Sequence, residues 1–223
     1  MERKSKERIS TVVRKEFKVN RIALSSSRDP NLRVRQFLNE LSIAIPNSIK
    51  INRGRMSLDQ LVVKAMERNA TYIMYITIRR GNPIAIKFIE IDYKNSTYRW
   101  LPYIIKLIGV KLIVDMPIRR VVKKKAKTAI IVSFDYHEVV DILSQILNIP
   151  VIQTRNLDEL KNQYDTIIVV RPVYNRPDFT CEIQMLDGED FGPRGPIIRI
   201  SRVYYITGKE LHLSPDIAEL LGE

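Results

Sequence analysis

Strand-like and helix-like segments alternate along this chain, and the whole alternation occurs twice. Short runs rich in β-branched residues are separated by longer stretches with the apolar spacing of a helix. In the first occurrence we expect strands at residues 21–25, 48–51, 72–78 and 84–91, and helices at residues 30–45 and 57–69. In the second we expect strands at residues 128–134, 150–153, 166–170, 179–186 and 197–206, and helices at residues 136–147 and 156–163.

Corresponding segments of the two occurrences lie about 100 residues apart. We therefore predict an α/β fold of two duplicated βαβαββ halves with mixed sheets, related by a pseudo-two-fold axis. The halves are expected at residues 19–92 and 128–223, with a connecting segment at 93–127 and a basic arm at 1–18. The alternative is chance recurrence, because βα alternation is common.

The charge of the chain points to polyanionic ligands. Lys and Arg total 37 against 25 Asp and Glu, a net charge of +12, while 45% of the residues are apolar. This composition is typical of a globular protein with a strongly positive exterior. Nucleic acid, an anionic membrane surface or an acidic protein could be the partner, and solubility alone is the alternative explanation of the charge.

The sequence contains neither a disulfide framework nor a membrane span. Its one cysteine, Cys181, excludes an intramolecular disulfide and a cysteine metal cluster. The charged first residues are not followed by the apolar stretch of a signal peptide. The most apolar segment, 100–116, is interrupted by Pro102, Lys106, Lys111 and Asp115, well short of about 20 apolar residues in a row. We expect a soluble, cytoplasmic monomer with no membrane contact.

The first candidate site is the turn between the strand at 21–25 and the helix at 30–45. Asp29 is the expected N-cap and Pro30 the first helical residue. The hydroxyl groups of Ser26 and Ser27, free backbone N–H groups and the helix dipole would converge on this turn, which suits a phosphate. Three arginines lie on or beside the first helical turns: Arg28, Arg33 and Arg35.

A second turn follows the strand at 48–51 and consists of Asn52, Arg53, Gly54 and Arg55. It can expose two guanidinium groups and an approachable backbone. In a parallel βαβ arrangement both strands end at the same edge of the sheet, so the two turns would be neighbours. Capping and turn formation alone would explain the Ser, Asp and Pro residues, but five arginines at two adjacent turns favour nucleic-acid binding.

A run of basic residues closes the connecting segment. Residues 119–127 contain no acid and six basic side chains: Arg119, Arg120, Lys123, Lys124, Lys125 and Lys127. We expect the four lysines to form a mobile second electrostatic contact with RNA.

The motifs of the first half resemble a known family. Ser26-Ser27-Arg28-Asp29-Pro30, followed by Arg33, Arg35 and Phe37, then Pro46-Asn47 and Ile51-Asn52-Arg53-Gly54, resembles the opening signature of the Brix domain. Gly192-Pro193-Arg194 before Ile198-Arg199-Ile200 is similar to the later Gly-Pro-Arg element of that family. The Gly195-Pro196 pair after Arg194 departs from the pattern, and the chain is similar to the short archaeal type.

This resemblance implies a fold of two halves, each similar to the anticodon-binding domain of class IIa aminoacyl-tRNA synthetases. It implies a role in ribosomal RNA processing and subunit assembly, nearest to the small-subunit processome member of the family. The implied partners are precursor ribosomal RNA and other ribosome-assembly proteins. Arg194 is carried over as a candidate RNA contact, and no catalytic activity is implied.

Two other functions stay open at this point. A protein-interaction scaffold in a pre-ribosomal particle would use the same basic regions on acidic partner segments. A metal-dependent nuclease would need Asp178 and Glu182 on one metal ion, but their separation leaves no turn between strands and the usual lysine is absent. Nucleotide-binding loops, nucleophile elbows and zinc-protease motifs do not occur in the sequence, so we expect no enzyme, cofactor or metal site.

Overall fold

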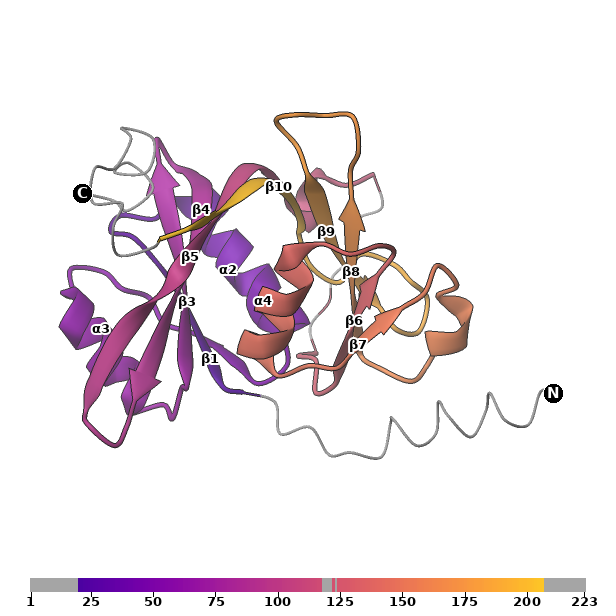
Figure 1. Cartoon of the computed structure of the whole chain (residues 1–223). Coiled ribbons are helices and arrows are strands. Elements are labelled where there is room, and N and C mark those ends of the chain that lie inside the picture. Colours follow the sequence, from indigo (N-terminus) through magenta and orange to yellow (C-terminus); the bar gives the residue numbers. More distant parts are fainter. Residues whose placement is uncertain (1–19, 118–121, 123, 207–223) are drawn as a thin grey trace.

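The computed structural model of this chain describes residues 20–117, 122 and 124–206. The first half contains β1 (Ile22–Ser26), α2 (Leu32–Ala44), β2 (Ser48–Lys50), α3 (Leu58–Met66), β3 (Tyr72–Arg79), β4 (Asn82–Asp92) and β5 (Thr97–Lys111), followed by the 3-10 turn η1 (Ile113–Asp115). The second half contains β6 (Ala129–Ser133), α4 (Glu138–Leu147), β7 (Val151–Gln153), the 3-10 turn η2 (Asp158–Leu160), β8 (Thr166–Pro172), β9 (Cys181–Asp187) and β10 (Ile197–Tyr205). Figure 1 shows the two halves side by side.

All ten of these strands form one mixed sheet, in the order β2-β1-β3-β4-β5-β10-β9-β8-β6-β7. The order from β2 inward to β5 is repeated from β7 inward to β10, which agrees with the predicted duplication. Strands β5 and β10 pair antiparallel in the middle and join the two halves. The α/β class is confirmed, but the halves share one continuous sheet instead of having separate ones. The similarity of each half to an anticodon-binding domain stays a prediction.

The segment at 93–127, predicted to be a connection, contains the long central strand β5. This strand contains Pro102, which cannot donate a backbone hydrogen bond to a neighbouring strand. It lies where the register between β4 and β5 shifts, between the pairs Lys87↔Ile104 and Ile89↔Trp100. A bulge of this kind accommodates proline inside a sheet, so the strand continues through it.

Two helices pack on one face of the sheet, and one packs on the other. The largest core cluster combines Phe37 of α2 and Ile146 of α4 with Met74 of β3. Ile73, the preceding residue of β3, packs instead with Leu61 of α3 in a second cluster. Ile73 and Met74 are successive residues of β3, so their side chains point to opposite faces of the sheet. Helices α2 and α4 therefore cover the face of Met74, between the two halves, and α3 covers the outer face, that of Ile73 (Figure 1).

The second helix predicted in the second half, at 156–163, is wrong. The chain forms only the short turn η2 there, and Leu160 is its one buried residue. One buried side chain provides too little apolar surface to stabilise a longer helix. By contrast, α3 begins as predicted at Ser57, whose side chain forms a capping box with Gln60. No helix in the described part of the chain is long and apolar enough to cross a membrane.

Candidate nucleic-acid interface

The two predicted arginine turns lie at the same edge of the sheet. Strand β1 pairs parallel with β2 and with β3, so all three strands end at this edge. The Ser25 hydroxyl donates to the Ile51 carbonyl at 2.9 Å, and the Ile51 N–H donates to the Leu24 carbonyl at 2.9 Å. These bonds hold the turn after β1 against the turn after β2, as the parallel order predicted.

The serines of the first turn use their hydroxyl groups inside the protein. Ser26 is only 2% exposed and its hydroxyl donates to the Ser27 carbonyl at 3.1 Å. The Ser27 hydroxyl accepts from the Ile78 N–H at 3.1 Å. Burial of Ser26 and its bond inside the turn argue against its predicted phosphate contact. Ser27 fastens the turn to β3 and only accepts in this bond, so its phosphate contact stays a prediction.

The start of α2 also differs from the prediction. Asn31, not Asp29, is the N-cap, and its side-chain oxygen accepts from the Val34 N–H at 2.9 Å. Asp29 has a left-handed backbone (φ 57°), whereas a capping residue needs the extended conformation that Asn31 adopts. The helix thus begins two residues later than the Asp-Pro pair suggested.

Arg28, Arg53 and Arg55 lie at this edge, as predicted. Arg28 and Arg55 are exposed, and so is Asn52 beside them. Arg53 is half-buried: its Nε donates to the Met56 carbonyl at 3.1 Å and its terminal nitrogen donates to the Tyr75 hydroxyl.

Arg33 and Arg35 differ in whether the guanidinium group is paired with a carboxylate. Two nitrogens of Arg33 contact the Asp115 carboxylate at 2.7 and 3.3 Å, and one also donates to the Val110 carbonyl at 3.0 Å. This pairing raises the pKa of Arg33 and lowers the pKa of Asp115. The charge of Arg33 is thus balanced by a carboxylate of the same protein. Arg35 is exposed, and its Nε donates to the Pro30 carbonyl at 3.0 Å.

A third turn at this edge was missed by the sequence analysis. The hairpin between β3 and β4 carries Arg79 and Arg80, both exposed. The contact between Ile78 and Ser27 holds this hairpin beside the first turn. The arginine doublet directly follows a predicted strand, but only the pairing of β3 with β1 places it beside the other arginines.

We call five of these residues the arginine edge: Arg28, Arg35, Arg53, Arg55 and Arg80. Across residues 20–117, 122 and 124–206, none of their guanidinium groups pairs with a carboxylate. They therefore carry uncompensated positive charge at one margin of the sheet.

The basic run of the connecting segment lies elsewhere. Lys124, Lys125 and Lys127 are exposed, whereas Lys123 lies outside the described residues. The Lys125 ammonium donates to the carbonyl of Ser48 at 3.5 Å, at the amino end of β2. The arginine edge lies at the carboxyl end of the same strand, so the two basic regions occupy opposite edges of the sheet.

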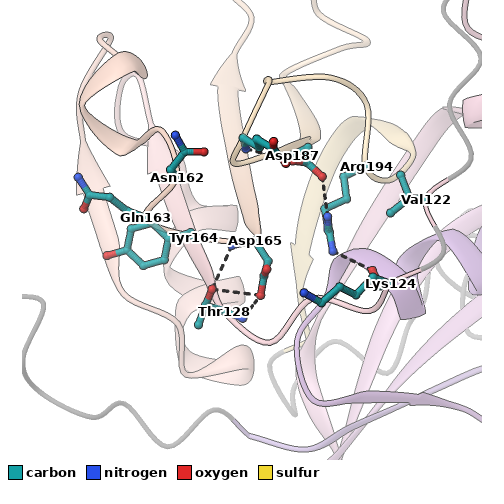
Figure 2. A pocket seen from close by; sticks show the side chains of 10 residues that line it. Val122, Lys124, Thr128, Asn162, Gln163, Tyr164, Asp165, Asp187 and Arg194 are labelled. Atoms are coloured by element: carbon teal, nitrogen blue, oxygen red, sulfur yellow. Dashed lines mark hydrogen bonds and ion pairs between the residues drawn. The ribbon is translucent and has the colours of Figure 1, made fainter.

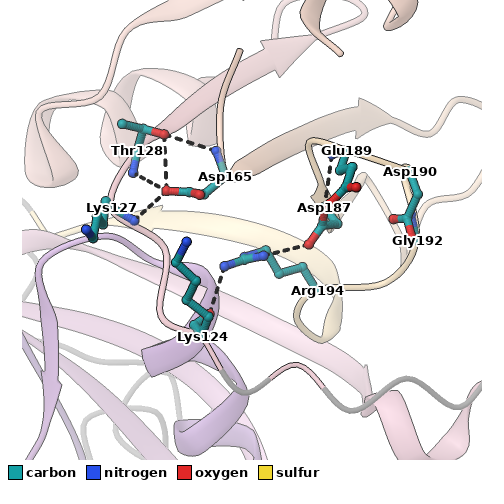
Figure 3. Close-up of polar contacts among 9 residues, drawn as sticks. All are labelled: Lys124, Lys127, Thr128, Asp165, Asp187, Glu189, Asp190, Gly192 and Arg194. Atoms are coloured by element: carbon teal, nitrogen blue, oxygen red, sulfur yellow. Dashed lines mark hydrogen bonds and ion pairs between the residues drawn. The ribbon is translucent and has the colours of Figure 1, made fainter. Parts of the chain in front are cut away.

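Arg194, carried over as an RNA contact, is buried instead. It donates to the Asp187 carboxylate at 2.6 Å and to the Lys124 carbonyl at 2.8 Å, and the side chains of this ion pair are 7% and 8% exposed. Figure 3 shows these bonds, with Asp165 beside them accepting from the backbone of Lys127 and Thr128 at 2.8 and 3.1 Å. A buried, paired guanidinium cannot reach a phosphate, so Arg194 attaches the connecting segment to the second half.

The same contacts form one wall of a cavity of about 560 Å³ (Figure 2). Lys124 and Arg194 line it together with Asp165, Asp187 and Glu189. Positive and negative groups are mixed there, so this cavity does not have the single sign of charge found at the arginine edge.

The residues of the nuclease hypothesis do not converge. Glu182 accepts from Arg199 at 3.1 Å and from Gln184 at 2.6 Å. Asp178 is exposed in the turn before β9. Within the described ranges, no cluster of three His, Cys, Asp or Glu side chains could hold a metal ion.

Comparison with known proteins identifies relatives, although no protein-family model matches the chain. A probable Brix domain-containing ribosomal biogenesis protein from Pyrobaculum aerophilum is 32% identical over 185 residues, which cover 83% of this chain and 96% of the relative. A protein of the same description from Pyrococcus furiosus is 24% identical over 185 residues, covering 79% of this chain and 82% of the relative.

Solved structures agree in fold. The crystal structure of a probable ribosomal biogenesis protein from Aeropyrum pernix matches with a TM-score of 0.63 at 21% identity, over 82% of this chain and 96% of that one. Mil, an archaeal Imp4-like protein, matches with a TM-score of 0.55 at 20% identity, over 82% and 99%. With the identity and coverage of the Pyrobaculum relative, these findings show that the chain belongs to the family of Brix domain-containing ribosomal biogenesis proteins.

Proposed function

We propose that this protein acts in ribosome biogenesis by binding ribosomal RNA through the arginine edge. Its relatives are named ribosomal biogenesis proteins, which supports the process, and the net charge of +12 supports a polyanionic ligand. Precursor ribosomal RNA is the proposed ligand, in the cytoplasm, with other assembly proteins as further partners. The names of the relatives describe assembly and not a reaction, so the proposal includes no catalytic step.

One observation carries the proposal: five guanidinium groups without carboxylate partners in the described residues gather at one edge. A guanidinium is planar and presents paired donors that match the oxygens of a phosphate. Arg28, Arg55 and Arg80 stand on three separate turns, so a chain of phosphates running along the edge could contact them in succession. Lys124, Lys125 and Lys127, at the opposite edge, would provide a second and separate contact.

Salt dependence of binding tests the electrostatic part of the proposal. If the five arginines each neutralise one phosphate of a single strand, the logarithm of affinity falls with the logarithm of salt at a slope of about −3.5. Fluorescence anisotropy of a labelled ribosomal RNA fragment, titrated at several salt concentrations, measures this slope.

A triple substitution tests the location. We expect Arg28→Ala, Arg53→Ala and Arg55→Ala together to weaken RNA binding at least tenfold and to reduce the slope by about two. The matched control removes the same charge elsewhere: Arg68→Ala, Arg155→Ala and Arg176→Ala, at three exposed positions. Equal loss in both variants would mean that net charge, and not the arginine edge, binds RNA.

The alternative is a protein-interaction scaffold, because an acidic peptide offers the same arginines a carboxylate. Under that reading the triple variant keeps its RNA affinity and loses binding to an acidic partner. The same titration therefore separates the two functions.

A further inference from the structure

The only tryptophan of the sequence, Trp100, lies on the outer face of the sheet, where the ring of Tyr75 separates it from Arg53 of the arginine edge. It pairs in register with Ile89 of β4, which is buried in the cluster beneath α3. Helix α3 reaches along β5 as far as Tyr98, whose hydroxyl donates to Asp59 of that helix at 2.7 Å. Trp100 comes two residues later on the same face, and 38% of it is exposed.

One cation and one aromatic ring contact the indole of Trp100. The Lys87 ammonium lies 4.4 Å from the centre of the Trp100 ring, and the Tyr75 ring meets the indole edge-to-face at 5.4 Å and 88°. These contacts fix the plane of the indole, because both neighbours are themselves buried.

The indole is continuous with the arginine edge through Tyr75. The Arg53 guanidinium lies 5.6 Å from the centre of the Tyr75 ring and bonds its hydroxyl. Burial raises the pKa of this hydroxyl, while the positive charges of Arg53 and Arg28 oppose the rise, so both arginines lie within electrostatic reach of it. The Tyr75 ring therefore contacts both the exposed indole of Trp100 and the guanidinium of Arg53, which we propose binds phosphate.

We propose that Trp100 stacks against an unpaired base of the RNA whose phosphates bind the arginine edge. The inference rests on the proposed function and narrows its ligand to single-stranded nucleotides. A base in a duplex has both faces covered by its neighbours, so it cannot lie on the indole, whereas an unpaired base can. Stacking on an aromatic ring accepts any base, so this contact selects the single strand and not its sequence.

The single tryptophan makes the inference directly measurable. Single-stranded oligoadenylate and oligouridylate RNA should quench the emission of Trp100 as they bind. Inorganic polyphosphate, which offers phosphates without bases, should compete for the arginine edge and leave the emission unchanged. A long RNA duplex, in which only the two terminal base pairs have an open face, should bind at the arginines with far less quenching per nucleotide.

Substitution gives the second readout. Trp100→Ala should raise the Kd for oligoadenylate about 5- to 140-fold, the range for loss of one base stack, and leave the affinity for polyphosphate unaltered. Trp100→Phe should keep part of the affinity, because a smaller ring remains. Tyr174→Ala is the matched control, since Tyr174 is 66% exposed in the other half of the molecule. Thermal unfolding checks that each variant is folded, and the quenching of the wild-type protein needs no variant.

Failure of this inference differs from failure of the proposed function. Unquenched emission with tight oligonucleotide binding, or unchanged affinity in folded Trp100→Ala, overturns base stacking and leaves the arginine edge in place. Equal quenching by the duplex also overturns it. No binding of RNA or polyphosphate at low salt overturns the proposed function itself.

Discussion

The buried ion pair between Arg194 and Asp187 yields the sharpest prediction about stability. Replacing Arg194 by Met keeps most of the side-chain volume but leaves the Asp187 carboxylate buried, at 8% exposure, without its guanidinium. It also removes the donor to the Lys124 carbonyl, which attaches the connecting segment. Breaking a buried pair from one side typically costs about 3–5 kcal/mol, because an uncompensated charge remains.

That cost is large against an ordinary stability of about 5–15 kcal/mol. For a domain of this size it corresponds to a fall in Tm of roughly 6–20 °C. Urea denaturation at pH 7, followed by circular dichroism, measures the change in the free energy of unfolding.

A second substitution tests the physical cause. In Asp187→Asn with Arg194→Met, the amide removes the unpaired charge and keeps an acceptor for the Glu189 N–H, which Asp187 binds at 3.0 Å. We expect the double variant to regain about 1–3 kcal/mol over Arg194→Met. A loss below about 1 kcal/mol in Arg194→Met, or no recovery in the double variant, would refute this reasoning. Folded Arg194→Met should bind RNA as the wild type does, since Arg194 is not exposed to a ligand.

Two further predictions concern packing and pH. Gly195→Ala should destabilise the protein by about 1–3 kcal/mol, because the added Cβ would lie 2.9 Å from the Ala44 Cβ and 2.9 Å from the Met185 sulfur. Gly109→Ala is the control, with no atom within 4 Å of the new Cβ, and equal unfolding midpoints in urea would contradict the packing argument. Burial lowers the pKa of His137, the N-cap of α4, from 6.5, so its contribution to stability is full above pH 6.5 and is lost as pH falls through the lower folded pKa. Denaturation at pH 7.5 and pH 5 should therefore show a larger loss for the wild type than for His137→Asn, and the same loss in both would exclude His137 as the cause.

Much of the fold could be predicted because local patterns determine it. The alternating strands and helices gave the parallel order of β1 and β2, and this order alone placed Arg28 beside Arg53 and Arg55. The start of α3 at Ser57 was readable in the same way, because a helix cap depends on residues only a few positions apart.

Which of the other arginines are available to a ligand depends on contacts between residues far apart in the sequence. Arg33 and Arg35 look equivalent in the sequence, yet only Arg33 meets Asp115, which lies far along the chain in the turn η1 after β5. Arg194 is likewise indistinguishable from a surface arginine until Asp187 and the connecting segment close around it.

The sequence by itself determined the α/β class, the repeated order of elements, the positive charge and the two turns that present Arg28, Arg53 and Arg55. These follow from hydrophobic period, turn residues and composition, which act over a few positions of the chain. Only the tertiary structure decided that the halves share one sheet through β5 and β10, that Arg80 joins the arginine edge, and that Tyr75 contacts both Trp100 and Arg53. The physical reason is that strand pairing and charge pairing join residues distant in sequence, and no local pattern specifies which partner each will find.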